Sequence, residues 1–188
     1  MGRDKRVVLF GPPLCGKTTL LTAYARWRGL SPERVELACG AAGLRHWVLR
    51  ARSMTAGTEL ITIPGAVWSP DAWWSLVGDA SAVALVLDSQ AVREEADCAH
   101  LTELANAPRC PSLGCVVWTK MDLVTKGGVD RVPTLPAPPA PGAPLRGQHE
   151  TSATMGATMA SWPTFMTRSD DAASLLAPLR YLVERLEA

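Results

Sequence analysis

Apolar residues recur along the chain in two spacings, which together predict alternating strands and helices. Short continuous apolar runs at residues 7–10, 82–87 and 115–118 are typical of buried parallel strands. Residues 46–52 alternate between apolar and polar, and residues 58–63 are predicted as a second strand that follows them. An apolar stripe at helical spacing occupies the stretch 169–187, and residues 19–28 and 93–106 are predicted as further helices. Strands that alternate with helices indicate an α/β fold with a mostly parallel central sheet and helices on both faces.

Glycine, turn and capping residues set the limits of these elements. Gly29 is predicted to end the first helix, and a turn at 55–57 joins two strands into an antiparallel pair at the edge of the sheet. Residues 148–152 are predicted as the last strand and residues 154–168 as an irregular insertion. Ser169 is predicted to cap the C-terminal helix 169–187, with Asp170 and Asp171 in its first turn. The length of 188 residues fits a single domain, 1–188.

Two segments have an unusual composition. Six prolines lie between residues 132 and 144, and proline this dense fits neither a helix interior nor a central strand. Residues 123–148 are therefore predicted as a surface loop, either a plain spacer or a ligand for a polyproline-reading domain. Residues 67–78 contain Trp68, Trp73 and Trp74, which form either ordinary core or an exposed patch for a partner.

Charge and cysteine content narrow the class of protein. The 19 Lys and Arg residues balance 18 Asp and Glu residues, so electrostatics give no reason to expect binding to nucleic acid or an anionic membrane. The five cysteines include no C-x-x-C pair, which indicates buried thiols in a reducing compartment. The sequence shows no signal peptide, no transmembrane run and no lipidation motif, so we expect a cytoplasmic protein without a direct membrane anchor.

The first predicted strand leads into a loop with the pattern G-x-x-x-x-G-K-T. With a strand before it and a helix after it, this pattern indicates a phosphate-binding P-loop rather than a chance match in a turn. Lys17 is expected to reach the β- and γ-phosphates, and the Thr18 hydroxyl is expected to bind Mg²⁺. The predicted phosphate site comprises Gly11, Pro13, Leu14, Cys15, Gly16, Lys17, Thr18 and Thr19.

Polar residues at two later strand ends predict a site for the base. Thr119, Lys120 and Asp122 follow the apolar run 115–118, at the edge where open α/β sheets bind ligands. A carboxylate such as Asp122 accepts two hydrogen bonds from guanine N1–H and the 2-amino group, a donor pair that adenine lacks. The stem of Lys120 is expected to lie along the base plane. Ser152 and Ala153 follow the last predicted strand, where a backbone N–H can bind guanine O6.

With these motifs in this order, the chain resembles a Ras-like small GTPase. Residues 11–18, 119–122 and 150–153 match the first, fourth and fifth guanine-nucleotide motifs, and residues 62–65 stand in place of the third. Their Thr-x-Pro-Gly form, with Asp-Ser-Gln at 88–90, is similar to the bacterial gliding-motility group, the MglA type. The resemblance covers residues 7–153. It implies a P-loop NTPase fold with GTP/GDP and Mg²⁺, and a cytosolic switch with a protein effector and a Roadblock-type regulator.

The sequence departs from that pattern around the γ-phosphate. Ala66 stands where the family has Gln, and the loop predicted at 37–44 contains no Ser or Thr to bind Mg²⁺. Thr62 and Gly65 remain at the third motif, and the backbone N–H of Gly65 is expected at the γ-phosphate. Asp88 either holds Mg²⁺ through water or caps the turn that follows it.

The resemblance also implies a catalytic arginine from the chain's own switch region. Arg45 is nearest to that position, and Arg50 and Arg52 follow it; the alternative is that all three are exposed strand arginines. Two functions therefore stay open: a switch with weak, partner-dependent GTP hydrolysis, and a GTP/GDP-binding interaction protein without hydrolysis. A nucleotide kinase or an ATPase is a more distant alternative, against which Asp122 argues.

Overall fold

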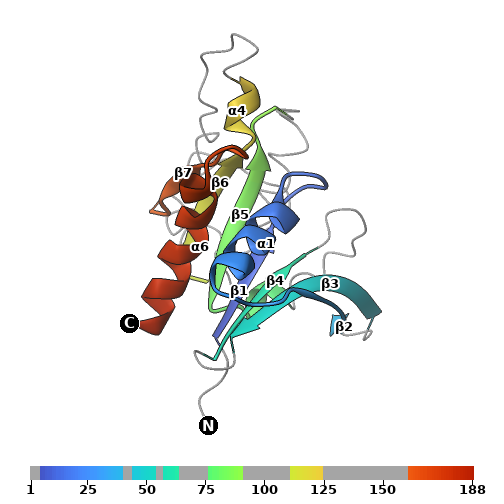
Figure 1. Cartoon of the computed structure of the whole chain (residues 1–188). Helices are drawn as coiled ribbons and strands as arrows, with labels where there is room; N and C mark the ends of the chain where they lie inside the picture. Colours follow the sequence, from blue (N-terminus) through green and yellow to red (C-terminus); the bar gives the residue numbers. More distant parts are fainter. Residues whose placement is uncertain (1–4, 40–43, 54–56, 64–75, 91–110, 125–160) are drawn as a thin grey trace, which may run out of the picture.

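The chain forms a mixed α/β fold around one seven-stranded sheet (Figure 1). The computed structural model describes residues 5–39, 44–53, 57–63, 76–90, 111–124 and 161–188. The strands are β1 (Lys5–Phe10), β2 (Glu33–Cys39), β3 (Leu44–Ser53), β4 (Thr58–Thr62), β5 (Ala82–Asp88), β6 (Gly114–Thr119) and β7 (Thr164–Met166), and the helices are α1 (Lys17–Trp27), α4 (Met121–Val124) and α6 (Ala172–Glu187).

The sheet has the order β2-β3-β4-β1-β5-β6-β7. Strands β4, β1, β5, β6 and β7 pair in parallel, whereas β2, β3 and β4 pair antiparallel. The predicted buried strands are confirmed, since every described residue of β5 and β6 is buried. The predicted antiparallel pair β3–β4 is confirmed as well, with Ser53 opposite Thr58 across the turn.

The edge strand β2 is a correction to the sequence analysis. The loop predicted at 37–44 is wrong at its ends, because Leu37 lies within β2 and Leu44 begins β3. Charged residues occupy much of β2, so its own apolar pattern is weak. Ion pairs to the neighbouring strand supply part of the missing stabilisation: Arg50 pairs with Glu33, and Arg45 pairs with Glu36 at 3.0 Å.

Two hydrophobic clusters cover the two faces of the sheet. Helices α1 and α6 lie side by side on one face, where Leu20, Leu21, Leu179 and Leu182 are fully buried (Figure 1). The opposite cluster contains Trp162 and residues 76 and 77 from a short helical stretch at 76–78. The predicted helix 93–106 and the three tryptophans at 68, 73 and 74 lie outside the described residues.

The last strand of the sheet differs from the prediction. β7 falls inside the stretch 154–168 that was predicted to be irregular, and it pairs in parallel with β6. Trp162 precedes it and packs against β6, where a Cβ on Gly114 would lie 2.3 Å from the indole ring. This contact explains why a glycine begins β6. The predicted strand 148–152 lies outside the described residues, as does most of the loop 123–148, of which Leu123 and Val124 belong to α4.

Helix α6 is confirmed, but its cap is not the predicted residue. Asp171 is the N-cap, and its carboxylate accepts from the backbone N–H groups of Ala173 and Ser174. Ser169 lies before the helix and has a different partner. Among the described helices, none has the length and apolar character needed to cross a bilayer. Cys15 and Cys115 are free, buried thiols, as predicted, and burial raises the pKa of Cys115 to about 12.

Candidate functional site

The loop between β1 and α1 has the backbone shape of a phosphate cradle. Gly11, Leu14 and Gly16 all have positive φ angles, of 147°, 62° and 96°. A Cβ on Gly11 would lie 2.0 Å from the carbonyl oxygen of Val86, so only glycine fits there. The turn brings the chain directly into α1, as the sequence pattern predicts. Pro13 and Leu14 form the exposed crest of the loop, and Leu14 is 89% exposed.

Lys17 folds back over this loop and is almost fully buried. Its Nζ donates to the carbonyl oxygens of Gly11, at 2.9 Å, and Pro12, and it lies 3.4 Å from the Sγ of Cys15. Burial lowers the pKa of the Lys17 ammonium and raises that of the Cys15 thiol. A cation held in this way needs no large movement to meet an anion bound in the loop.

The backbone N–H groups in the first turn of α1 have no side-chain acceptor from the helix cap, so they can donate to a bound anion. Its N-cap is Gly16, which offers no side chain, and the first turn contains no acidic residue. Thr18 and Thr19 are exposed there. This is the arrangement in which a helix N-terminus attracts phosphate. Among the described residues, no cluster of three His, Cys, Asp or Glu side chains forms a metal site.

Thr119 joins the loop to the neighbouring strands. Its buried hydroxyl lies 2.7 Å from the carbonyl oxygen of Cys15 and 3.1 Å from that of Leu87, so these two acceptors share its one proton. Its methyl group also packs 3.2 Å from the position of a Cβ on Gly16. The sequence analysis assigned Thr119 to nucleotide binding. The structure shows that its side chain holds the loop between β1 and α1 against the end of β6.

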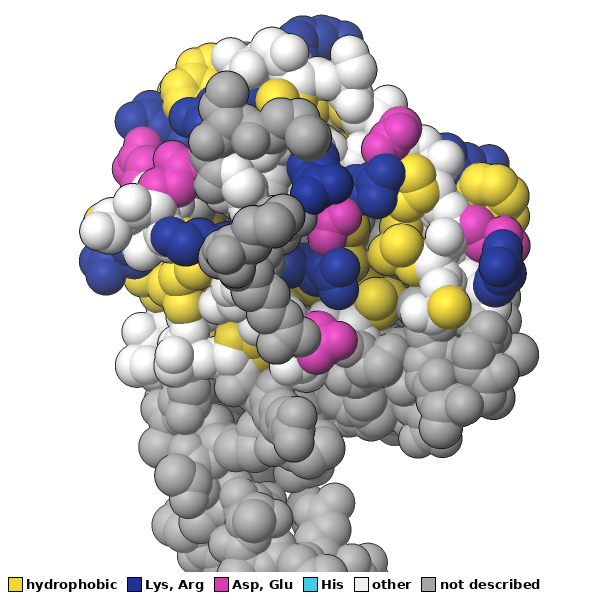
Figure 2. Space-filling view, turned by 90° about the horizontal axis from the view of Figure 1, so that it is seen from below, with side chains coloured by type: hydrophobic (Ala, Val, Ile, Leu, Met, Phe, Trp, Pro, Cys, Tyr) yellow, Lys and Arg dark blue, Asp and Glu magenta, His cyan; other side chains and the backbone are white. Residues whose placement is uncertain are grey.

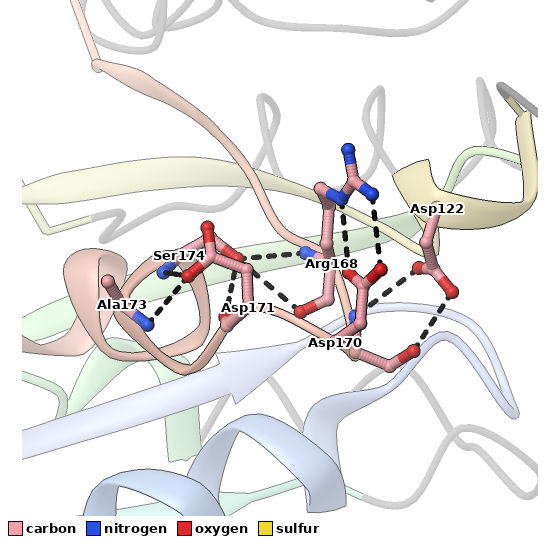
Figure 3. A network of polar contacts seen from close by, with 7 residues as sticks. Asp122, Arg168, Asp170, Asp171, Ala173 and Ser174 are labelled. Atoms are coloured by element: carbon pink, nitrogen blue, oxygen red, sulfur yellow. Dashed lines mark hydrogen bonds and ion pairs between the residues drawn. The ribbon is translucent and has the colours of Figure 1, made fainter.

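Asp122 lies just beyond β6 and is held by the segment that follows β7 (Figure 3). One carboxylate oxygen accepts the backbone N–H of Ser169 at 3.3 Å, and the other accepts the Ser169 hydroxyl at 2.9 Å. The hydroxyl hydrogen bond is the main reason that the pKa of Asp122 is lowered. Arg168, next to Ser169, forms two hydrogen bonds to the carboxylate of Asp170 (Figure 3).

Lys120 and Asp88 form an ion pair that the sequence analysis did not predict. The Nζ of Lys120 lies 2.5 Å from one oxygen of Asp88, and the other oxygen accepts the backbone N–H of Gln90 at 3.0 Å. Asp88 thus caps the turn after β5, which was the alternative to the metal-ligand role. Lys120 itself has a φ of 59°, so its backbone turns sharply at the end of β6.

Two other predicted site residues belong to the sheet. The buried hydroxyl oxygen of Thr62 accepts the backbone N–H of Leu49 at 3.3 Å, across the β3–β4 pair. Arg45 projects from β3 with 72% of its side chain exposed and pairs with Glu36. Among the described residues, neither side chain has a hydrogen bond or an ion pair to the loop between β1 and α1. Gly65, Ala66, Ser152 and Ala153 lie outside the described residues.

Ser169 is the site residue that sequence reasoning missed. Its position directly before the acidic residues Asp170 and Asp171 is typical of a helix cap. The sequence analysis therefore assigned it to the helix and did not predict its hydrogen bonds to Asp122. The signal that could have found it is the short apolar pair Phe165-Met166, followed by Thr167 and two polar residues. That arrangement repeats the strand-end pattern seen at 115–122.

Comparisons with known proteins give little further information. No known protein family matches the sequence, and no curated protein matches it. Among solved structures, a bacterial selenocysteine-specific elongation factor, EF-Sec, aligns with 98% of this chain at 16% identity and a TM-score of 0.49. The chain spans 29% of the length of that structure.

Proposed function

We propose that this chain is a guanine-nucleotide-binding domain of the Ras-like P-loop class. The observation that carries the proposal is the Asp122 carboxylate, fixed by both hydrogen-bonding groups of Ser169 at the sheet edge where the phosphate loop ends. Thr119 ties these two parts of the site together through the carbonyl of Cys15. A phosphate cradle after β1 and an oriented carboxylate after β6, with only β5 between these strands, are what a nucleoside polyphosphate requires.

The phosphate half of the proposal rests on the start of α1. Backbone N–H groups of the first turn bind the phosphate oxygens, and Lys17 turns from the loop carbonyls to the β- and γ-phosphates. We propose that the Thr18 hydroxyl, which is exposed in the first turn of α1, binds Mg²⁺. The metal ion, when bound, neutralises charge that develops on the phosphates.

The base half rests on Asp122 and Lys120. A carboxylate has about four acceptor positions, and Ser169 engages one on each oxygen. Guanine N1–H and its 2-amino group donate to the same carboxylate. We propose that the Lys120 stem flanks the base while Asp88 holds its ammonium. The backbone contact to guanine O6 stays a prediction for Ser152 and Ala153, which lie outside the described residues.

Exchange of the base-reading group tests this assignment. Asp122→Asn leaves one acceptor and introduces one donor, so guanine loses a partner and the 2-oxo group of xanthine gains one. We expect the preferred ligand to change from GTP to XTP in titration calorimetry. Lys17→Ala is the matched control, because it lowers the affinity for both nucleotides without changing the preference. Equal binding of ATP and GTP by the unmodified protein would contradict the guanine assignment.

For hydrolysis, we propose weak, partner-dependent turnover by a cytoplasmic switch of the MglA type, with a protein effector and a Roadblock-type regulator. A Thr-x-Pro-Gly third motif at 62–65 supports this proposal. A binding protein without hydrolysis is the second candidate, and the ion pair of Arg45 with Glu36 favours it, because this arginine is engaged on the outer strands.

Ala66→Gln separates the two candidates. Glutamine supplies an amide that orients the attacking water, and such water-positioning groups are central to hydrolysis in this class. We expect single-turnover GTP hydrolysis to accelerate if the rest of the site is assembled. No acceleration, together with tight GTP binding and no response to a Roadblock-type partner, favours the non-hydrolysing protein. Rapid turnover by the unmodified protein alone contradicts the proposed role of Ala66.

A further inference from the structure

The outer strand β2 has an exposed edge that carries an ordered pattern of charge. Among the described residues, β2 pairs only with β3, so its other edge ends the sheet. Glu33, Arg34, Glu36 and Ala38 are exposed along it. An uncovered strand edge can pair with another strand, and charged residues on it restrict which partner and which register are possible.

Arg34 and Glu36 lie on the same face of this edge. They are two residues apart in one strand, and Trp47 stands directly opposite Glu36 on β3. The guanidinium of Arg34 lies 5.6 Å from the centre of the Trp47 ring, which is itself 52% exposed. Figure 2 shows basic and acidic side chains next to each other, beside hydrophobic ones, at its right-hand side, where the β2–β3 hairpin lies.

We propose that two copies of this chain associate through antiparallel pairing of their β2 edges. In a two-fold pair, the same strand meets itself, so residue i of one copy lies opposite residue j of the other and the reverse is also true. When Val35 lies on the axis, Arg34 faces Glu36 of the partner copy, and Glu36 faces Arg34 of the partner copy. The pattern is therefore self-complementary and forms two cross-strand ion pairs.

The neighbouring registers are disfavoured by like charges. With Arg34 on the axis, the Arg34 side chains of the two copies lie opposite each other. With Glu33 or Glu36 on the axis, two glutamates lie opposite each other. Like charges directly opposite each other across a strand pair are destabilising, whereas opposite charges are stabilising. The charges that block general edge-to-edge aggregation thus permit one specific register. With Val35 on the axis, Glu33 lies opposite Leu37 on the other face, which adds no like-charge pair.

Charge reversal provides the test, read by sedimentation velocity of the full chain over a range of concentrations. We expect the unmodified protein to form a dimer that weakens with salt. Arg34→Glu places glutamates opposite Glu36 of the partner copy, and Glu36→Arg places arginines opposite Arg34 of the partner copy. Each variant alone is expected to raise the dimer dissociation constant by at least about tenfold, because two attractions become repulsions.

The two variants complement each other, which makes the experiment specific. In a 1:1 mixture, two glutamates of one copy face two arginines of the other, so we expect a heterodimer to form from two monomeric variants. Its formation also shows that both variants are folded, including Glu36→Arg, which loses the ion pair with Arg45. Arg26→Glu, an exposed charge reversal on α1, is the control and is expected to dimerise like the unmodified protein.

Three results would overturn the proposal. They are a monomeric unmodified protein at every concentration, dimers that survive both single reversals, and monomeric variants that stay monomeric when mixed. Nucleotide affinity is measured on the same samples. Because neither substitution touches the phosphate loop, an unchanged affinity keeps the outcome separate from that of the proposed function.

Discussion

Thr119→Val tests whether one hydroxyl holds the phosphate loop in place. Valine has nearly the shape of threonine but no donor, so the carbonyl oxygens of Cys15 and Leu87 lose the one hydroxyl proton that they share, from an oxygen 2.7 Å and 3.1 Å away. Thr119 is buried, so water does not readily replace them. A buried acceptor left without its donor costs about 1–3 kcal/mol. We expect the unfolding free energy to fall by about 2 kcal/mol and Tm by about 4–8 °C.

The measurement is urea denaturation of the unmodified protein, Thr119→Val and Thr119→Ser. Serine keeps the hydroxyl and removes only the methyl group that packs near Gly16. We also expect a weaker GDP affinity for the valine variant in titration calorimetry, because the peptide at Cys15 lies within the phosphate loop. If the valine variant is as stable as the unmodified protein and the serine variant is not, methyl packing holds the loop and the hydrogen-bond argument is refuted.

Two further predictions concern the ends of β6 and β7. Gly114→Ala drives a methyl group into the buried Trp162 ring, and we expect a loss of about 1–3 kcal/mol in urea denaturation; an unchanged stability would mean that the ring moves freely. Ser169→Ala removes the main cause of the lowered Asp122 pKa, so this carboxyl should titrate at higher pH in an NMR titration. The pKa of Asp122 in the folded protein lies below the reference value of 3.8. The stabilisation by Ser169 is therefore fully present above about pH 3.8 and is lost as the pH falls through the lowered pKa.

Local patterns were sufficient for the central part of the fold. The apolar runs of β1, β5 and β6 predict buried parallel strands, because strands covered on both faces have few polar positions. The P-loop pattern likewise predicts its own backbone, since Gly11 and Gly16 take the positive φ angles that the bend requires. In both cases the deciding interactions involve residues close in sequence or a strongly apolar environment.

Strands stabilised by a neighbour could not be found in this way. β2 depends on its pairing with β3, to which ion pairs add, and the three-residue β7 depends on its pairing with β6. For the same reason, the partners of Asp122 and Lys120 were not predicted: Ser169 lies 47 residues from Asp122, and Asp88 lies 32 residues from Lys120. The type of residue singled out the segment 119–122 as a candidate base site, but only the fold could show which side chains hold it.

Helix α6 connects opposite edges of the molecule. Its N-cap, Asp171, lies beside the segment that holds Asp122. At its other end, the Leu186 carbonyl accepts from Lys5, and the Glu187 carboxylate accepts from the Thr58 hydroxyl at the start of β4. Its 16 residues correspond to a rod about 24 Å long. Ala188 therefore lies at the edge opposite the proposed nucleotide site, and a fluorophore, a surface tether or a fused domain attached there is far from that site. Immobilising the protein there keeps the phosphate loop and Asp122 open to ligand.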